Sequence, residues 1–484
     1  MASSANKHSD KLEHNYIMMQ AFEWYTQGEG KHWKWLGENA KRFADIGITA
    51  VWIPPPTKGA SASSTGYDIY DIWDLGEFAH PRDKEAGVQP ANRTKYGTRQ
   101  ELEAALNELR KNGISIYVDA VLNHRMGADE LQTFKVRMVD QNDRSKLISD
   151  AYDIEGWTKF TFPGRNDNYS DFKWGFEHFT GVDWDQKAQT KAIFRIEDDG
   201  KQWATDKDLL DWGAWIMSNF PVAGFRFDAV KHMSRDFLHD FVKHIREEAR
   251  KLRKERGIEA ADESQGPIAF SVGEFWKDSL DSCLKYLTNF GDEQFSLFDA
   301  PLHYNFKEAG DAAENYDLPL ESTVPAQFKP LAYALILMRL DGYPCVFLGD
   351  LDGCNTTGID NGEGKAEPMA DLDKFVKARK YYAYGEQRDV WDHPNCIAWV
   401  RTGSKTDDND AGYDASATII CNGTEQGSKP VEVGKRYAGQ NFVDVIGSFQ
   451  GEQKVNDDGW VEVHCHPRSA SIWVPENSKH RQFF

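Results

Sequence analysis

Three apolar runs in this sequence carry residues that can perform acid–base chemistry. The residues and their runs are Asp119 in "ISIYVDAV" (114–121), Arg226 and Asp228 in "VAGFRFDA" (222–229), and Glu274 in "IAFSVGEF" (268–275). A single carboxylate at the end of a strand is ordinarily a cap or a salt-bridge partner. Several carboxylates that converge on one place indicate a functional site, because like charges must be held there against repulsion.

Two of these carboxylates suit glycoside hydrolysis, which needs one carboxylate and one carboxylic acid in different environments. Arg226 precedes Asp228 by two residues and therefore lies on the same face of the strand. A guanidinium at that position favours the charged carboxylate, which suits a nucleophile or an electrostatic stabiliser. Glu274 lies in "SVGEFW", and its apolar and aromatic neighbours disfavour the charged form. Glu274 therefore suits the general acid.

The elements that must position these residues are short apolar runs that alternate with amphipathic helical segments. The expected strands are 16–24, 48–55, 114–121, 222–229, 268–275, 295–301 and 343–350. Continuous apolar runs between helices indicate parallel strands that are covered on both faces. Repeated βα units over this length predict an α/β fold, a (β/α)8 TIM barrel, whose active site lies at the C-terminal ends of the strands. Only seven strands can be counted, whereas a closed barrel of this type needs eight. The gap falls at 313–337, between the sixth and the last expected strand, so strand seven is the one missing from the pattern.

The pattern divides the chain into a barrel and two further parts. The expected domains are a catalytic barrel (15–123 and 208–400), a small inserted domain after strand three (124–207), a C-terminal antiparallel β-sandwich domain (401–476) and a loose tail (477–484). The inserted segment is polar and rich in aromatic residues. The C-terminal part consists of short strands that are separated by turn signals.

Composition and charge exclude several classes of partner. The net charge of −20 disfavours nucleic acid and anionic membranes. No apolar run approaches the roughly 18 residues of a membrane span, and the first residues, "MASSANKHSDKLEHNY", show no apolar core of a secretory signal. The six cysteines are scattered, which is typical of reduced thiols. We therefore expect a cytoplasmic protein with a small neutral or cationic partner, or with no charged partner at all. We also expect a monomer.

Several ordered segments together resemble the α-amylase family of glycoside hydrolases. The signature-like segments are "DAVLNH" (119–124), "GFRFDAVKH" (224–232) and "GEFW" (273–276). Further segments, such as "MMQAFEWY", "GYDIYDIWDLGEF" and "FPGRNDNYSDFKW", resemble the liquefying bacterial-type subgroup, which also includes intracellular fungal enzymes. The resemblance extends from about residue 15 to about residue 475.

The resemblance implies an activity and a set of site residues. It implies a retaining endo-hydrolase of α-1,4-glucosidic bonds in starch-like or glycogen-like glucans, with Asp228 as nucleophile and Glu274 as acid/base. The residues that it places along the bound sugar chain are Arg226, His124, Lys231, His232, Tyr67 and Trp24. Without the resemblance, Tyr67 and Trp24 would be read as ordinary packing residues, and the two histidines as structural ones.

The sequence departs from the family at two places. The family carries a third catalytic Asp in an Asn-His-Asp signature on strand seven, and this sequence contains no Asn-His-Asp. It passes from "YDL" (316–318) directly to "LESTVPAQFKP" (320–330), so we expect strand seven to be absent. A second loop is missing near 204–206, and in relatives that loop supplies much of a calcium site. Calcium is therefore a family expectation that the sequence weakens, with Asn123 and His232 as the remaining metal-site residues.

Three functions remain compatible with these residues. The first is the α-glucan hydrolase. The second is a catalytically impaired α-glucan-binding protein, because the third carboxylate is absent. The third is an α-glucan transglycosylase that uses the same nucleophile and acid. The retained pair Asp228 and Glu274 favours hydrolase or transferase descent over simple binding.

Overall fold

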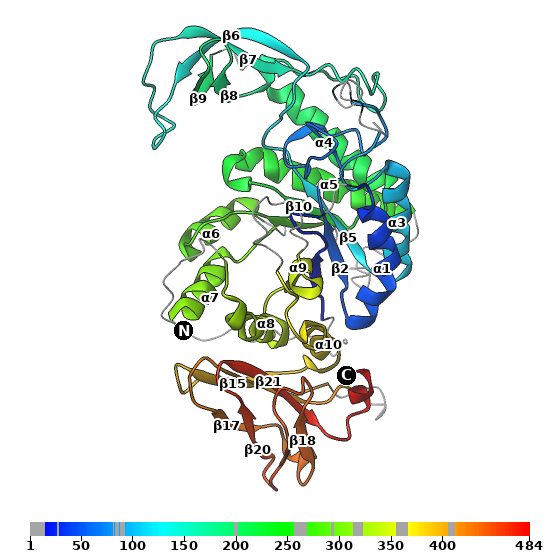
Figure 1. Cartoon of the computed structure of the whole chain (residues 1–484), viewed down its shortest axis with the longest axis vertical. Coiled ribbons are helices and arrows are strands. Elements are labelled where there is room, and N and C mark those ends of the chain that lie inside the picture. Colours follow the sequence, from blue (N-terminus) through cyan, green and yellow to red (C-terminus); the bar gives the residue numbers. More distant parts are fainter. Residues whose placement is uncertain are drawn as a thin grey trace. The chain divides into compact units, whose positions relative to one another are not determined.

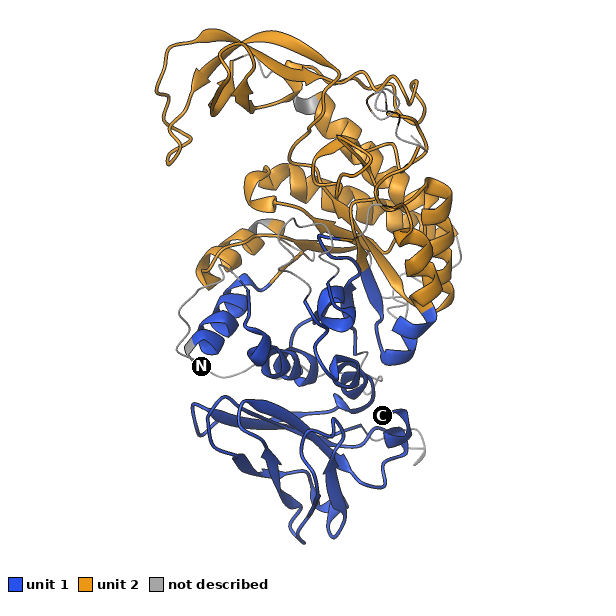
Figure 2. Ribbon diagram, in the orientation of Figure 1, with its two compact units in different colours: residues 1–25, 41–51, 299–484 blue, residues 26–40, 52–298 orange. Residues whose placement is uncertain are grey.

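The computed structural model describes most of the chain. The described residues are 15–26, 29–80, 82, 87, 92–197, 202–255, 269–291, 295–312, 323–354, 366–404 and 412–484. They form two compact units, which Figure 2 colours separately. The first unit comprises Met1–Tyr25, Lys41–Val51 and Asp299–Phe484, and the second comprises Thr26–Ala40 and Trp52–Phe298.

A parallel sheet carries the residues that the sequence singled out. Its seven strands follow the order β12-β11-β10-β5-β2-β1-β13. Their bounds are β1 (Met18–Gln20), β2 (Ala50–Ile53), β5 (Ser115–Ala120), β10 (Gly224–Phe227), β11 (Phe270–Gly273), β12 (Ser296–Leu297) and β13 (Cys345–Phe347). Each strand lies within one of the seven apolar runs that the sequence predicts. The predicted alternation of parallel strands and helices is therefore confirmed.

Helices connect these strands, as the periodicity predicts (Figure 1). Their bounds are α1 (His32–Ile46), α3 (Arg99–Lys111), α4 (Gln202–Asn219), α5 (Arg235–Glu255), α6 (Leu280–Leu287), α7 (Ala300–Ala312), α8 (Lys329–Met338), α9 (Leu348–Asp352) and α10 (Leu372–Tyr382). Helix α3 begins at a capping box, in which Thr98 and Glu101 each accept a hydrogen bond from the other's backbone N–H. In the described part of the chain, no helix is long and apolar enough to cross a membrane.

The stretch where strand seven was expected falls in 313–322, which lies outside the described residues. On its two sides, α7 ends at Ala312, and the 3-10 helix η5 (Ala326–Phe328) leads into α8. Strands β12 and β13, the sixth and seventh of the described parallel strands in chain order, stand at the two ends of the sheet order.

A separate four-stranded antiparallel sheet lies between β5 and α4 in the chain. Its strands are β6 (Glu130–Met138), β7 (Tyr152–Lys159), β8 (Gly181–Asp185) and β9 (Thr190–Ile196), in the order β7-β6-β9-β8. Its own small core contains Phe134, Val136, Ile154 and Phe194. Helix α4 begins at Gln202 and runs without a break through the place near 204–206 where the sequence lacks the family's loop.

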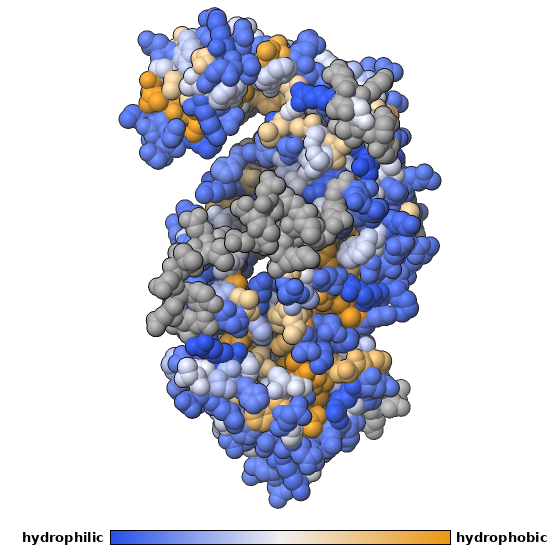
Figure 3. Space-filling view, in the orientation of Figure 1, coloured by the Kyte–Doolittle hydropathy of each residue, from blue (hydrophilic) through white to orange (hydrophobic). Residues whose placement is uncertain are grey.

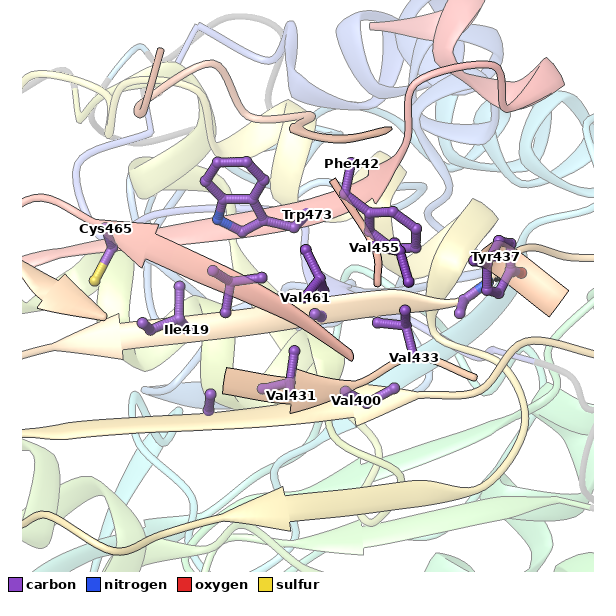
Figure 4. Packing of buried hydrophobic residues seen from close by; sticks show 14 of the residues in the cluster. Val400, Ile419, Val431, Val433, Tyr437, Phe442, Val455, Val461, Cys465 and Trp473 are labelled. Carbon is purple, nitrogen blue, oxygen red and sulfur yellow. Dashed lines mark hydrogen bonds between the residues drawn. The ribbon is translucent and has the colours of Figure 1, made fainter. Parts of the chain in front are cut away.

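The C-terminal part is an antiparallel sandwich. A six-stranded sheet, β14-β15-β16-β21-β18-β19, faces a two-stranded sheet, β17-β20. The bounds are β14 (Gln387–Val390), β15 (Cys396–Arg401), β16 (Ser416–Cys421), β17 (Gly427–Glu432), β18 (Asn441–Asp444), β19 (Glu452–Lys454), β20 (Trp460–Cys465) and β21 (Ser469–Pro475). The sheet thus begins at Gln387, before the position 401 that the pattern indicates. Figure 4 shows Val431, Val461 and Trp473 in the core between the strands.

The last residues are fixed to the first unit, so the expectation of a loose tail is wrong. They form the 3-10 helix η7 (Lys479–Phe483). The ring of Tyr381 stacks on that of Phe483 with 4.7 Å between centroids. The hydroxyl of Tyr382 lies 3.0 Å from that of Ser478. Short polar segments at a chain end give no periodic signal, and only the tertiary contacts reveal this docking.

Candidate active site

The parallel register brings the predicted carboxylates together within the second unit. Arg226 of β10 stands opposite Asp119 of β5 on one side and Val272 of β11 on the other. The chain continues past both strand ends, where the backbone N–H of Asp228 donates to Ala120 O at 3.1 Å and that of Glu274 donates to Phe227 O at 2.9 Å. Asp228 and Glu274 therefore leave neighbouring strands at the same edge of the sheet, as the barrel hypothesis requires.

Arg226 joins three carboxylates. Its Nη1 donates to Asp119 Oδ1 at 2.7 Å and to Asp228 Oδ1 at 2.8 Å. Its Nη2 lies 2.9 Å from Glu274 Oε2. The side chain is buried, with 4% of its surface exposed. Burial opposes the charge of Arg226, but Asp119, Tyr67, Glu274 and Asp228 outweigh that effect and hold its pKa above the ordinary value.

Asp119 is the fully buried member of this cluster, with 0% exposure. Its Oδ2 accepts hydrogen bonds from Trp52 Nε1 at 3.0 Å and from the Tyr67 hydroxyl at 2.7 Å. Burial raises the pKa of Asp119 to about 6, although Arg226 acts in the opposite direction. Asp119 therefore orients Arg226 and Tyr67 from beneath the site. Sequence reasoning placed Asp119 at a strand end but did not predict these partners.

The environment of Glu274 differs from the sequence expectation. We expected apolar and aromatic neighbours, but Arg226 lies against its carboxylate. The backbone N–H of Ala229 also donates to Glu274 Oε2 at 3.2 Å. Ala229 adopts a left-handed conformation with φ of 49°, in which its N–H is turned toward the neighbouring strand end. The one-dimensional pattern misses these partners because they belong to β10 and to the residue that follows its strand end.

Tyr67 and His124 lie beside the carboxylates. The guanidinium of Arg226 lies 5.8 Å from the centre of the Tyr67 ring and 4.7 Å from that of Trp52. The His124 Nε2 lies 2.6 Å from the backbone oxygen of Tyr67. The two predicted sugar-binding residues are thus in contact with each other. Trp52 was missed, and its only sequence signal is a tryptophan within an otherwise aliphatic strand.

Lys231 and His232 follow Asp228 in the 3-10 helix η2 (Val230–His232). Both side chains are exposed. Partial desolvation of the His232 ring, together with the charges of Arg144 and Lys231, lowers the pKa of His232. Trp24 belongs to the first unit, and its side chain is 60% exposed. Trp24 is therefore not among the residues that the second unit brings together.

Asn123 and His232, the two residues named for calcium, offer few of the oxygen ligands that this ion needs. Calcium takes six to eight oxygen ligands, whereas the exposed Asn123 presents its amide nitrogen 3.5 Å from His124 Nδ1. Among the described residues, no group of three or more His, Cys, Asp or Glu side chains could hold a metal ion.

Two buried acids elsewhere in the second unit, Asp71 and Asp74, have protein cations as partners. Arg165 Nε donates to Asp71 Oδ2 at 2.8 Å, and Lys58 Nζ lies 3.4 Å from Asp74 Oδ2. Burial raises the pKa of Asp71 to about 6. Sequence reasoning did not predict these pairs.

Comparisons with known families agree with this fold. The family described as "Alpha amylase, catalytic domain" matches residues 32–329, and the family described as "Alpha-amylase C-terminal" matches residues 419–474. The chain belongs to the alpha-amylase family, and it is therefore a glycoside hydrolase by descent. The resemblance that the sequence motifs indicated is confirmed.

Individual relatives match over nearly the whole chain. The chain is 38% identical to "Glucan 1,4-alpha-maltohexaosidase" of Bacillus sp. (strain 707), across 95% of this chain and 92% of that protein. It is 33% identical to "Cytoplasmic alpha-amylase" of Escherichia coli (strain K12), across 96% of this chain and 99% of that protein. The solved alpha-amylase from Malbranchea cinnamomea has a TM-score of 0.55 at 15% identity and covers 96% of each chain, which shows a shared fold.

Proposed function

We propose that this protein is a retaining endo-hydrolase of α-1,4-glucosidic bonds in starch-like or glycogen-like glucans. The observation that carries the proposal is the contact of one buried guanidinium, that of Arg226, with both Asp228 and Glu274. The names of the relatives, maltohexaosidase and alpha-amylase, support the same reaction class. Among the described residues, the retained pair Asp228 and Glu274 favours catalysis over simple glucan binding.

The two carboxyl groups divide the chemistry between them. Asp228 attacks the anomeric carbon while Glu274, in its acid form, protonates the departing glycosidic oxygen. The bond from the anomeric carbon to that oxygen breaks, and a glycosyl ester on Asp228 forms. Water then attacks the same carbon, Glu274 takes a proton from the water, and the ester breaks. The product keeps its anomeric configuration because two displacements occur.

Arg226 has a positioning role in this proposal. Its guanidinium donates to both Asp228 and Asp119 from a buried position, so it fixes the direction of the nucleophile. Tyr67 and His124 form one wall beside these groups, and Lys231 and His232 lie on the segment that follows the nucleophile. We assign all four to the binding of successive sugar units.

We propose the domain organisation that this reading implies. It comprises a barrel (15–123 and 208–386), an inserted domain around the four-stranded sheet (124–207) and a C-terminal sandwich that begins at Gln387. The barrel lacks the strand-seven segment with its third carboxylate, a proposal that rests on the missing Asn-His-Asp signature. Two carboxyl groups instead of three then act on the transition state of glycosidic bond cleavage. Turnover is therefore expected to be slow.

Partners and location follow the same reading. We propose a monomer that acts on α-glucan in the cytoplasm, an assignment that the name of the Escherichia coli relative supports. We propose that calcium is dispensable, because the residues named for it offer too few oxygen ligands.

Product analysis tests the reaction class. Maltoheptaose is incubated with the protein, and the fresh products are followed by proton NMR and chromatography. We expect shorter maltooligosaccharides whose new reducing ends are initially α-anomers. Initial β-anomers would contradict the double displacement, and products longer than maltoheptaose would show transglycosylation. Binding without any product would indicate a glucan-binding protein.

A further inference from the structure

Three buried thiols meet in the C-terminal sandwich, far in sequence from the proposed catalytic residues. Cys396, Cys421 and Cys465 are 9%, 3% and 0% exposed, and all three are free. They belong to the same hydrophobic core, and Figure 4 shows Cys465 at one end of it. A hydrophobic role needs no such convergence, because aliphatic side chains would fill this space without reactive sulfur.

The strand register sets Cys396 of β15 directly opposite Cys421 of β16. The next residue pair along these strands, Asn395 and Asn422, is a hydrogen-bonded pair, because the backbone N–H of Asn422 donates to Asn395 O at 2.8 Å. Hydrogen-bonded and non-hydrogen-bonded pairs alternate along antiparallel strands, so Cys396 and Cys421 form a non-hydrogen-bonded pair. Such pairs have the shorter Cα separation, about 4.5 Å, which lies within the range that a disulfide spans.

Gly427 of β17 leaves room for the sulfur atoms. A β-carbon on Gly427 would lie 3.0 Å from Cys396 Sγ, 3.0 Å from Cys421 Cβ and 2.8 Å from Cys465 Sγ. Cys465 reaches this point from the opposite sheet, since it stands across from Gly427 in the β17–β20 pair. The glycine thus keeps open a space that the side chains of Cys396 and Cys421 share with that of Cys465.

We propose that Cys396 and Cys421 are a modification site, a thiol pair that low-molecular-mass disulfides of the glutathione type oxidise to a cross-strand disulfide. Cys396 is the more exposed partner and reacts first. Its thiolate attacks the small disulfide, which forms a mixed disulfide and releases one small thiol. The thiolate of Cys421 then attacks Cys396 Sγ, the protein disulfide forms and a second small thiol leaves. The small disulfide gains the two electrons, and the two protein thiols lose their protons to solvent.

Cys465 does not take part in this bond, because it is the most deeply buried of the three and belongs to the facing sheet. Burial raises the pKa of Cys396, so oxidation should accelerate as the pH rises and more thiolate forms. The new bond would join two adjacent strands and close the chain segment between them. It should therefore stabilise the sandwich by restricting the unfolded chain.

Disulfide mapping tests the proposal without any measurement of activity. The full chain is incubated with oxidised glutathione at pH 8, remaining thiols are alkylated without reduction, and peptides are identified by mass spectrometry. We expect a peptide that links Cys396 to Cys421, with a mass two hydrogens below that of the two thiol peptides, and an increase in Tm that reduction reverses.

Matched variants sharpen the result. Cys465→Ser and Cys354→Ser should retain the link, whereas Cys421→Ser should remove it and leave a glutathione adduct on Cys396. A link that contains Cys465, or unmodified Cys396 and Cys421 in the folded protein after prolonged oxidation, would overturn the proposal. The wild-type mapping stands by itself if a variant fails to fold.

Discussion

Arg226 and Asp119 face each other across two neighbouring parallel strands, and Arg226 Nη1 donates to Asp119 Oδ1 at 2.7 Å. Both side chains are buried. The same Nη1 also contacts Asp228, so the direction of the proposed nucleophile depends on a pair that lies beneath it. The site is therefore built on a buried charge network. Replacement of any one member should destabilise the protein, because the remaining buried charges lose a partner.

Arg226→Lys should lower both activity and stability. A lysine ammonium cannot reproduce the planar fork that reaches Asp119, Asp228 and Glu274 together. We expect kcat/KM on soluble starch to fall by at least ~100-fold, and stability to fall by about 3 kcal/mol because buried charges lose a partner. Steady-state hydrolysis and urea unfolding measure the two effects.

Arg388→Lys is the matched control. Arg388 Nη1 lies 3.3 Å from Glu432 Oε2 in a partly exposed pair, which should contribute little to stability. Equal losses in the two variants would contradict the special role of Arg226.

Asp119→Asn should change the pH dependence of stability. The pKa of Asp119 is raised to about 6 from 3.8, so the folded state holds this proton more tightly than the unfolded state. The contribution is fully present below pH 3.8 and is lost as the pH rises through about 6. The unfolding free energy of wild type minus that of the variant should therefore decrease across this window, by up to about 1.4 kcal/mol per pH unit.

Urea unfolding of both proteins between pH 4 and pH 7 measures this difference. Burial also raises the pKa of Asp71 to about 6. Asp71 is present in both proteins, so its contribution to the pH dependence cancels in the difference. A difference that increases with pH would show that Arg226, rather than burial, controls the titration of Asp119.

Two substitutions at Tyr67 separate its two proposed roles. Tyr67→Phe removes the hydroxyl that donates to Asp119 Oδ2 at 2.7 Å and keeps the ring. It should destabilise the fold by about 1 to 3 kcal/mol, because a buried carboxylate oxygen loses a donor, and leave KM nearly unchanged. Tyr67→Ala also removes the stacking surface and should raise KM for maltoheptaose. Equal KM values in the two variants would argue against sugar stacking.

Calcium removal should leave the protein unaffected. The buried acids Asp71 and Asp74 already have Arg165 and Lys58 as partners. A bound ion would stabilise the folded state by an amount that grows with the logarithm of its concentration divided by its Kd. Thermal unfolding in excess EDTA and in millimolar CaCl2 should give Tm values within about 2 °C of each other. A clear increase with CaCl2, but not with MgCl2, would reveal a calcium site.

The sequence predicts strand positions well and side-chain partners poorly. All seven apolar runs became strands, because burial on both faces leaves a continuous apolar signal. The contact between Arg226 and Glu274 was not predictable, because it depends on the register of two strands that are distant in the chain. Strand β14, "QRDV", is polar and gives no strand signal, whereas the apolar β15 also lies before residue 401, where the pattern places the start of the sandwich.

The release of reducing ends from soluble starch tests the central claim most directly. Wild type, Asp228→Asn and Glu274→Gln are compared with the control Asp278→Asn, which alters an exposed carboxylate four residues after Glu274. The proposed mechanism predicts measurable release by wild type and Asp278→Asn, and a loss of at least ~1,000-fold in the two site variants. Release by Asp228→Asn at the wild-type rate, or no release by wild type, would contradict it.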